Sequence, residues 1–158
     1  MPNTEPKNKC EITRYENDAT YLEFQKQNCN GLRLVAVPFG EDAQLSMSAD
    51  AGDFRKWLRQ NQSSWNVESQ KPDVRVDLHA ADIWLPIVWL GENVALPVFL
   101  SLVSSYVYDK VKGDLRGDRR EVHFKAVYKS KRTGVSQELS FQGSIDDLNR
   151  LKEKLRDE

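Results

Sequence analysis

The chain has 158 residues, 39% of them hydrophobic, and a formal net charge of −1. This length favours one globular domain with a sizeable core. A net charge so close to zero excludes a global electrostatic attraction to nucleic acid or to an anionic membrane.

The N-terminal residues lack the basic-then-apolar pattern of a secretory signal. Residues 1–11 are polar and are predicted to form a flexible tail, followed by one domain over residues 12–158. The two cysteines, Cys10 and Cys29, are too few for a disulfide framework. We therefore expect a cytoplasmic protein with free thiols, and a single Cys10–Cys29 disulfide is the alternative.

The first regular pattern after the tail is a short alternation. Leu22 and Phe24 alternate with polar neighbours, which predicts a half-buried strand over residues 21–27. Asn30-Gly31 predicts a turn into a second strand over residues 32–37. The two strands together predict a β-hairpin.

The next segment predicts a third strand over residues 44–47 and then a helix over residues 51–61. The apolar side chains of this helix lie at i, i+3 and i+4, namely Phe54, Trp57 and Leu58. The polar segment 60–71 is the candidate boundary between two subdomains. Residues 73–79 alternate again and predict a strand whose inward side chains are Val74, Val76 and Leu78.

Residues 83–108 form an apolar run with one charged residue, Glu92. A polar break at residues 91–93 divides the run into two parts, residues 83–90 and 94–108. Each part is shorter than the ~20 residues that a helix needs to cross a bilayer. We therefore expect a buried segment followed by a buried helix, and no membrane partner.

The buried helix is predicted over residues 94–111. Asn93 is its predicted N-cap, and Pro97 is tolerated because it lies close to the first turn. The core residues expected on this helix are Val98, Leu102 and Val103.

The C-terminal part predicts an antiparallel hairpin and a helix. Residues 122–128 and 135–141 alternate, and the inward side chains of the first strand are Val122, Phe124, Ala126 and Tyr128. Ser144 and Asp147 have capping-box spacing at the start of the last helix. The predicted fold is α+β, with antiparallel hairpins, helices packed on one sheet face, and a C-terminal strand-helix-hairpin-helix unit.

Catalytic motifs are weak. Asp77, His79 and Asp82 are candidate metal ligands, but metal sites usually need three or more converging ligands, so exposed polar residues on a sheet are the favoured interpretation. Glu121 and Lys125 have residue types found in restriction-type nucleases, at the wrong spacing. The sequence contains no nucleophile-elbow or phosphate-binding glycine motif. We predict no catalytic residues and no cofactor, and a metal-dependent hydrolase remains a third alternative.

Residues 109–132 carry nine basic and four acidic residues. Such a cluster attracts phosphates, so nucleic-acid binding is the second functional hypothesis. Its candidate residues are Arg116, Arg119, Arg120, Lys125, Lys129, Lys131 and Arg132. The alternative interpretation is a hairpin tip protected against edge-to-edge aggregation by its charges.

The first functional hypothesis is a non-enzymatic interaction or regulatory module that binds another protein or a second copy of itself. Its candidate anchors are Trp84, Trp89 and Tyr106, because aromatic side chains anchor interfaces. We expect at least one of the two tryptophans in this set to be partly exposed.

Overall fold

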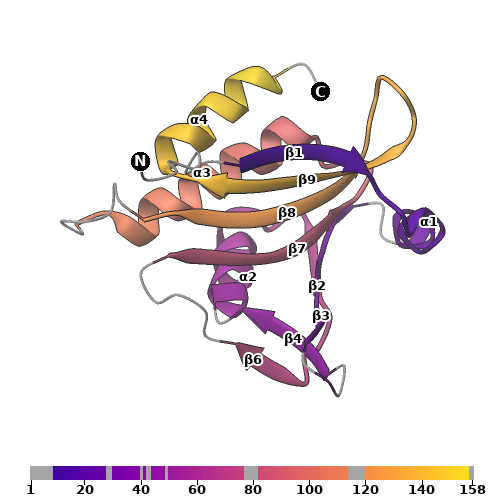
Figure 1. Ribbon diagram of the computed structural model, residues 1–158, viewed down its shortest axis with the longest axis horizontal. Coiled ribbons are helices and arrows are strands. Elements are labelled where there is room, and N and C mark those ends of the chain that lie inside the picture. The colour runs from indigo at the N-terminus through magenta and orange to yellow at the C-terminus, as the bar shows by residue number, and fades with distance from the viewer. Residues whose placement is uncertain are drawn as a thin grey trace, which may run out of the picture.

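The computed structural model (Figure 1) describes residues 9–27, 30–39, 41, 44–48, 50–76, 82–113 and 120–156. These residues form two sheets and four helices, which confirms the predicted α+β class. The larger sheet has the order β1 (Lys9–Arg14), β9 (Ser136–Gly143), β8 (Val122–Lys129), β7 (Ile83–Leu90), β2 (Gly31–Val35) and β5 (Asn66–Ser69). The smaller sheet has the order β3 (Val37–Phe39), β4 (Gln44–Ser48) and β6 (Val74–Val76). The helices are α1 (Asp18–Gln27), α2 (Asp50–Asn61), α3 (Leu96–Val111) and α4 (Ile145–Lys154).

The larger sheet is mixed. β1, β9 and β8 are antiparallel neighbours, and β2 is antiparallel to β7. β7 runs parallel to β8, and α3 makes the long connection that a parallel pair requires. The predicted C-terminal unit is therefore present as β7, α3, the β8–β9 hairpin and α4.

The main core lies between one face of the larger sheet and the helices α2, α3 and α4, of which α2 and α3 lie behind the strands in Figure 1. Alternation along β8 places its apolar side chains on this side. All of the predicted inward residues are buried there, namely Val122, Phe124, Ala126 and Tyr128. We call the opposite face of the sheet, toward the viewer in Figure 1, the open face.

Pro86 interrupts the regular pairing of β7 with β8. Between Trp84 and Ile87, β7 advances three residues while β8 advances two. A bulge suits proline, which has no N–H for the hydrogen-bond ladder. A regular strand would place Trp84 and Trp89 on opposite faces, whereas the extra residue places both on the open face.

The predicted strand over residues 21–27 is wrong, because this segment belongs to α1. Tyr21 and Phe24 are buried at helical spacing, and Leu22, expected inward, is exposed. The short alternation fits both periods, and packing of the two aromatic side chains on one end of the open face decides for the helix. The first predicted hairpin is therefore absent, and β2 pairs with β7 and β5 instead.

The predicted helix in the apolar run is α3, and its N-cap is Ala95 rather than Asn93. The prediction that Val98 lies in the core is wrong, because its side chain is 46% exposed, whereas Val103 is fully buried and Leu102 is partly buried. The helix turns Val98 away from the sheet and turns the adjacent Phe99 toward it. Among the described residues, no helix is long and apolar enough to span a membrane.

Two other helices start and end close to their predicted positions. α2 buries Phe54 and Leu58 on its predicted face. α4 begins with the predicted capping box, in which the Ser144 side chain accepts a hydrogen bond from the Asp147 backbone N–H and the Asp147 side chain accepts one from the Ser144 backbone. Local spacing was sufficient in both cases because the signals lie within one or two turns.

In three segments the structure differs from what the polarity of the sequence suggests. Residues 9–11 belong to β1, which pairs with β9. Residues 66–69, within the predicted boundary segment 60–71, form β5. Strands that precede this segment in the chain and strands that follow it therefore lie in the same sheet. Val74, expected inward, is exposed on β6. Cys10 is an exposed free thiol, and Cys29 lies outside the described residues.

A partly buried polar network joins α2 to α3. Tyr106 donates a hydrogen bond to Asp53 Oδ2 at 2.7 Å, and Lys110 Nζ lies 2.8 Å from Asp50 Oδ1. Burial of the phenol, followed by its hydrogen bond to Asp53 and the negative charges of Asp53 and Asp50, raises the pKa of Tyr106 far above its ordinary value. The fold therefore strongly favours the neutral phenol.

This raised pKa predicts a loss of stability in alkali. The contribution of Tyr106 is complete below the unfolded pKa of about 10 and is lost as the pH rises above it, at about 1.4 kcal/mol per pH unit. Burial also raises the pKa of Tyr21, so the wild type should lose stability above about pH 10 through both tyrosines. Urea unfolding between about pH 9 and pH 11 should show a shallower loss in Tyr106→Phe, and the difference is the contribution of Tyr106. The control is Tyr108→Phe, because Tyr108 is exposed and its loss should not change the slope. Equal slopes in wild type and Tyr106→Phe would contradict the prediction.

Candidate binding groove

A groove of about 700 Å³ lies where the open face of the larger sheet meets the smaller sheet. β2 ends at Val35 and β3 begins at Val37, so a single residue, Ala36, carries the chain from one sheet into the other. In Figure 1 the smaller sheet lies below β7 and is joined to the larger one through β2 and β3. The groove occupies the angle between them.

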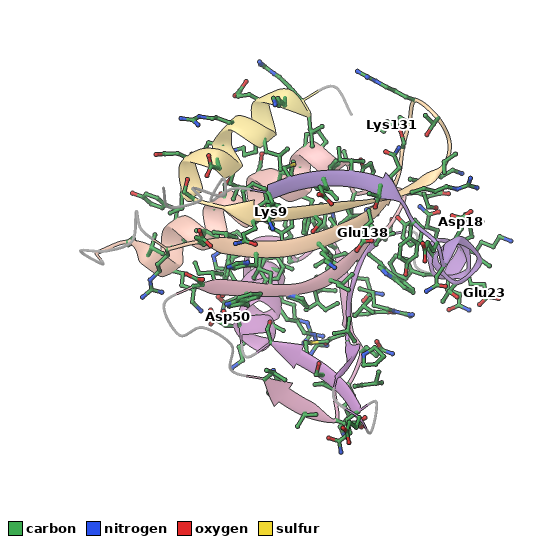
Figure 2. The ribbon with its side chains drawn as sticks, viewed as in Figure 1. Lys9, Asp18, Glu23, Asp50, Lys131 and Glu138 are labelled. Carbon is green, nitrogen blue, oxygen red and sulfur yellow. The ribbon has the colours of Figure 1, made fainter. Side chains whose placement is uncertain are left out.

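The two walls of the groove come from the two sheets. The wall from the smaller sheet carries Val37, Ser46, Ser48 and Val76, which the strand pairing places on one face. The wall from the larger sheet carries Trp84, Ile87, His123, Lys125, Ser140 and Gln142. Lys9 and Glu11 from β1 also line the groove, and Figure 2 labels Lys9 on this open face. The groove therefore combines apolar side chains with charges of both signs.

Trp84 is held firmly in this groove. Its indole stacks on the His123 imidazole, with ring centroids 3.7 Å apart and parallel planes. Its backbone N–H donates to Asp50 Oδ2 at 2.9 Å, and its carbonyl accepts from Ser48 Oγ at 2.5 Å. β2 pairs with β7 only from Ile87 onward. The side chains of Asp50 and Ser48 therefore satisfy the backbone groups of Trp84 that β2 does not reach.

A polar cluster adjoins the Trp84–His123 stack. Asp82 immediately precedes β7, and Glu121 immediately precedes β8. His123 Nε2 lies 3.3 Å from Asp82 Oδ2 and 3.8 Å from Glu121 Oε2. Gln142 on β9 donates to Glu121 Oε2 at 3.1 Å, and the Glu121 backbone N–H donates to Asp82 Oδ1 at 3.3 Å.

The structure separates the three predicted aromatic anchors. Trp89 is 7% exposed beneath α1, and Tyr106 is buried between α2 and α3. Trp84 keeps a partly exposed side chain and lines the groove. At least one of the two tryptophans is thus partly exposed, as expected, and it is Trp84.

The predicted metal candidates are only partly described. Asp77 and His79 lie outside the described residues, whereas Asp82 lies in the polar cluster. Glu121 and His123 were not among the metal ligands predicted from the sequence. Their spacing of two residues on a strand was the available signal, but only the parallel pairing of β7 with β8 brings them to Asp82.

The basic candidates lie on and beside the β8–β9 hairpin. Lys125 and Lys129 are exposed on β8, and Lys131 and Arg132 are exposed in the turn that follows. Lys125 Nζ lies 4.0 Å from Glu138 Oε1. Arg120 is partly buried just before β8, and Arg116 and Arg119 lie outside the described residues.

A second hollow, of about 820 Å³, lies beside β5 and carries three arginines, Arg33, Arg55 and Arg59. Arg33 is already paired with Glu68 at 2.8 Å. Burial, followed by the nearby charge of Arg59, lowers the pKa of Arg55. The groove between the sheets is the stronger candidate because it joins apolar walls to a converging polar cluster.

The chain matches no protein-family model, and neither the curated proteins nor the solved structures contain a match to it. Its function must therefore be inferred from the groove and the residues around it.

Proposed function

We propose that this protein is a non-catalytic interaction module that binds an extended segment of a partner protein in the groove between the two sheets. The observation that carries the proposal is the placement of Trp84, which is partly exposed, stacked on His123, and shares the groove with Val37 and Val76 of the smaller sheet. Aromatic side chains in such positions anchor interfaces at little cost in side-chain entropy. A cytoplasmic location belongs to the same proposal and depends on the sequence evidence.

The walls of the groove suit a polypeptide better than a strongly charged ligand. Val37 and Val74 are exposed on β3 and β6, the two edge strands of the smaller sheet. Edge strands offer unpaired backbone groups to an extended segment, and alternate side chains of that segment would enter the groove. The charged side chains that line the groove are Lys9, Lys125 and Glu11, an excess of a single positive charge.

The proposal predicts that a charge in the groove abolishes binding. A phage-displayed library of random peptides is selected on the wild type, and the selected peptides are tested by fluorescence anisotropy. Val37→Asp should weaken them at least about tenfold, or about 1.4 kcal/mol, because it places an unpaired charge against apolar side chains. Val37 is 39% exposed, so this change removes little of the core.

The matched control is Val98→Asp, since Val98 is similarly exposed but lies on α3. Peptides that bind both variants as well as the wild type, or a selection that enriches no peptide, would overturn the proposal. Sedimentation of the free protein shows whether the chain self-associates, which is expected if the bound segment belongs to a second copy of the chain.

Nucleic-acid binding is the second candidate function, favoured by the exposure of the four basic residues on and after β8. Fluorescence anisotropy with labelled single-stranded DNA tests this candidate separately from the peptides. Binding that weakens steeply with salt and is lost in Lys129→Glu/Lys131→Glu/Arg132→Glu would support this candidate. No binding at low salt would reject it.

A further inference from the structure

We propose that Asp82, Glu121 and His123 form a binding site for a divalent transition-metal ion, for which zinc is the test ion. The three residues each offer one ligand atom, and these atoms lie within 4.8 Å of one another. One imidazole nitrogen with two carboxylate oxygens is a common ligand set for such ions, whereas magnesium and calcium prefer oxygen ligands alone.

The distances between the ligand atoms fit an ion placed among them. A tetrahedral zinc ion with ligands at about 2.0–2.1 Å holds neighbouring ligand atoms about 3.3–3.4 Å apart. His123 Nε2 and Asp82 Oδ2 have this separation, at 3.3 Å. His123 Nε2 and Glu121 Oε2 are 3.8 Å apart, and all three ligand atoms lie within 4.8 Å of one another, so the two carboxylates would have to move closer to complete the site.

The alternative is an ion pair between a protonated His123 and the carboxylates. Charge-assisted N–H···O bonds are about 2.7–2.9 Å long, and both nitrogen–oxygen distances here exceed that range. The contact of His123 with Asp82 is therefore a long hydrogen bond rather than a strong ion pair, and an ion that binds between the two groups would have only this weak contact to replace.

The fold supports the three ligands as a metal site requires. In the register of β7 with β8, Ile83 faces Val122 and Trp84 faces His123, so the residues one step earlier, Asp82 and Glu121, are also neighbours. The stack on Trp84 sets the plane of the imidazole, and the Gln142 amide orients Glu121. Such outer partners hold ligands in position in known metal sites.

The site also has room for another ligand. Three protein ligands leave at least one position of a zinc ion open. The His123 side chain is 12% exposed, and both His123 and Gln142 line the groove. The open position would be filled by water or by an oxygen atom of whatever occupies the groove.

The test uses the untagged full chain with Cys10→Ser and Cys29→Ser, so that thiols do not contribute. Equilibrium dialysis against zinc should give one ion per chain. Asp82→Asn and Glu121→Gln keep side-chain size, and each should weaken zinc binding by about 100-fold, the upper end of what outer partners alone contribute. Glu138→Gln is the matched control, because Glu138 is a carboxylate on the same open face, at its other end (Figure 2), and should leave affinity unchanged.

A second readout uses the stacking of Trp84 on His123. Nickel bound at His123 should quench the fluorescence of Trp84, and zinc should reverse the quenching by competition. Trp84→Phe should remove the quenched part of the signal while one zinc ion still binds. The proposal is overturned if the chain binds no stoichiometric zinc, if the Asp82→Asn/Glu121→Gln double variant binds as tightly as its parent, or if Glu138→Gln weakens binding equally. If one single variant fails to fold by circular dichroism, the other carries the test.

Discussion

Replacing Trp89 by alanine is expected to lower the free energy of unfolding by about 3–5 kcal/mol, the range measured for large aromatic truncations in cores. Its indole is enclosed between the larger sheet and α1. The ring centroids of Tyr15, Tyr21 and Phe24 lie 6.3, 5.9 and 5.6 Å from that of Trp89. Truncation would leave a cavity under α1 and remove the edge-on contacts with two tyrosines.

Urea unfolding followed by circular dichroism measures this loss. Trp84→Ala is the matched control, and its cost should be smaller because Trp84 is partly exposed in the groove. If Trp89→Ala instead costs less than about 1 kcal/mol and abolishes association with a partner, then Trp89 is an interface anchor and α1 does not cover it in solution.

Replacing Gly31 by alanine is expected to cost about 3 kcal/mol, at the upper end of the range for overpacking. A Cβ on Gly31 would lie 1.9 Å from the backbone oxygen of Asn66 on β5. The obstacle is backbone, so no side-chain rotation relieves it. The parallel pairing of β2 with β5, which starts at Gly31 and Asn66, would have to separate.

The same chemical change at Gly52 should have the opposite sign. Gly52 lies inside α2, where alanine is favoured over glycine by about 0.8–1.0 kcal/mol. The nearest atom to its added Cβ is the end of the flexible Arg75 side chain at 3.3 Å, which can move aside. Thermal unfolding of both variants decides the matter, and a Gly31→Ala protein as stable as wild type would show that β5 is not tightly paired.

The groove proposal and the metal proposal can fail separately. Val37→Asp changes the smaller-sheet wall without touching a proposed ligand, and Glu121→Gln changes a ligand without adding a charge to that wall. If the protein binds zinc but no peptide, the metal-site proposal stands and the proposed function is wrong. A protein that binds peptide but no zinc would leave the polar cluster as a support for His123 and Trp84.

The sequence by itself determined the elements whose signals are local. The β8–β9 hairpin follows from alternation over eight-residue strands, and α4 follows from the capping box of Ser144 and Asp147. The apolar run was correctly divided at residues 91–93 into a buried strand and a helix, although Val98 and Tyr108 of that helix are exposed. Its second part is α3, since Pro97 is compatible with a helix only near the start.

Only the tertiary structure decided which residues meet. The seven residues 21–27 fit a strand or a helix, and burial of Tyr21 and Phe24 against the sheet selected the helix. The bulge at Pro86 brought both tryptophans to one face, and α1 then covered Trp89 and left Trp84 in the groove. Asp82 lies 39 residues from Glu121 in the chain. They become neighbours because α3 connects β7 to β8 so that the two parallel strands start side by side, and no local sequence pattern predicts this. Strand pairing and face selection depend on contacts distant in sequence, so the candidate site appeared only when the sheet was assembled.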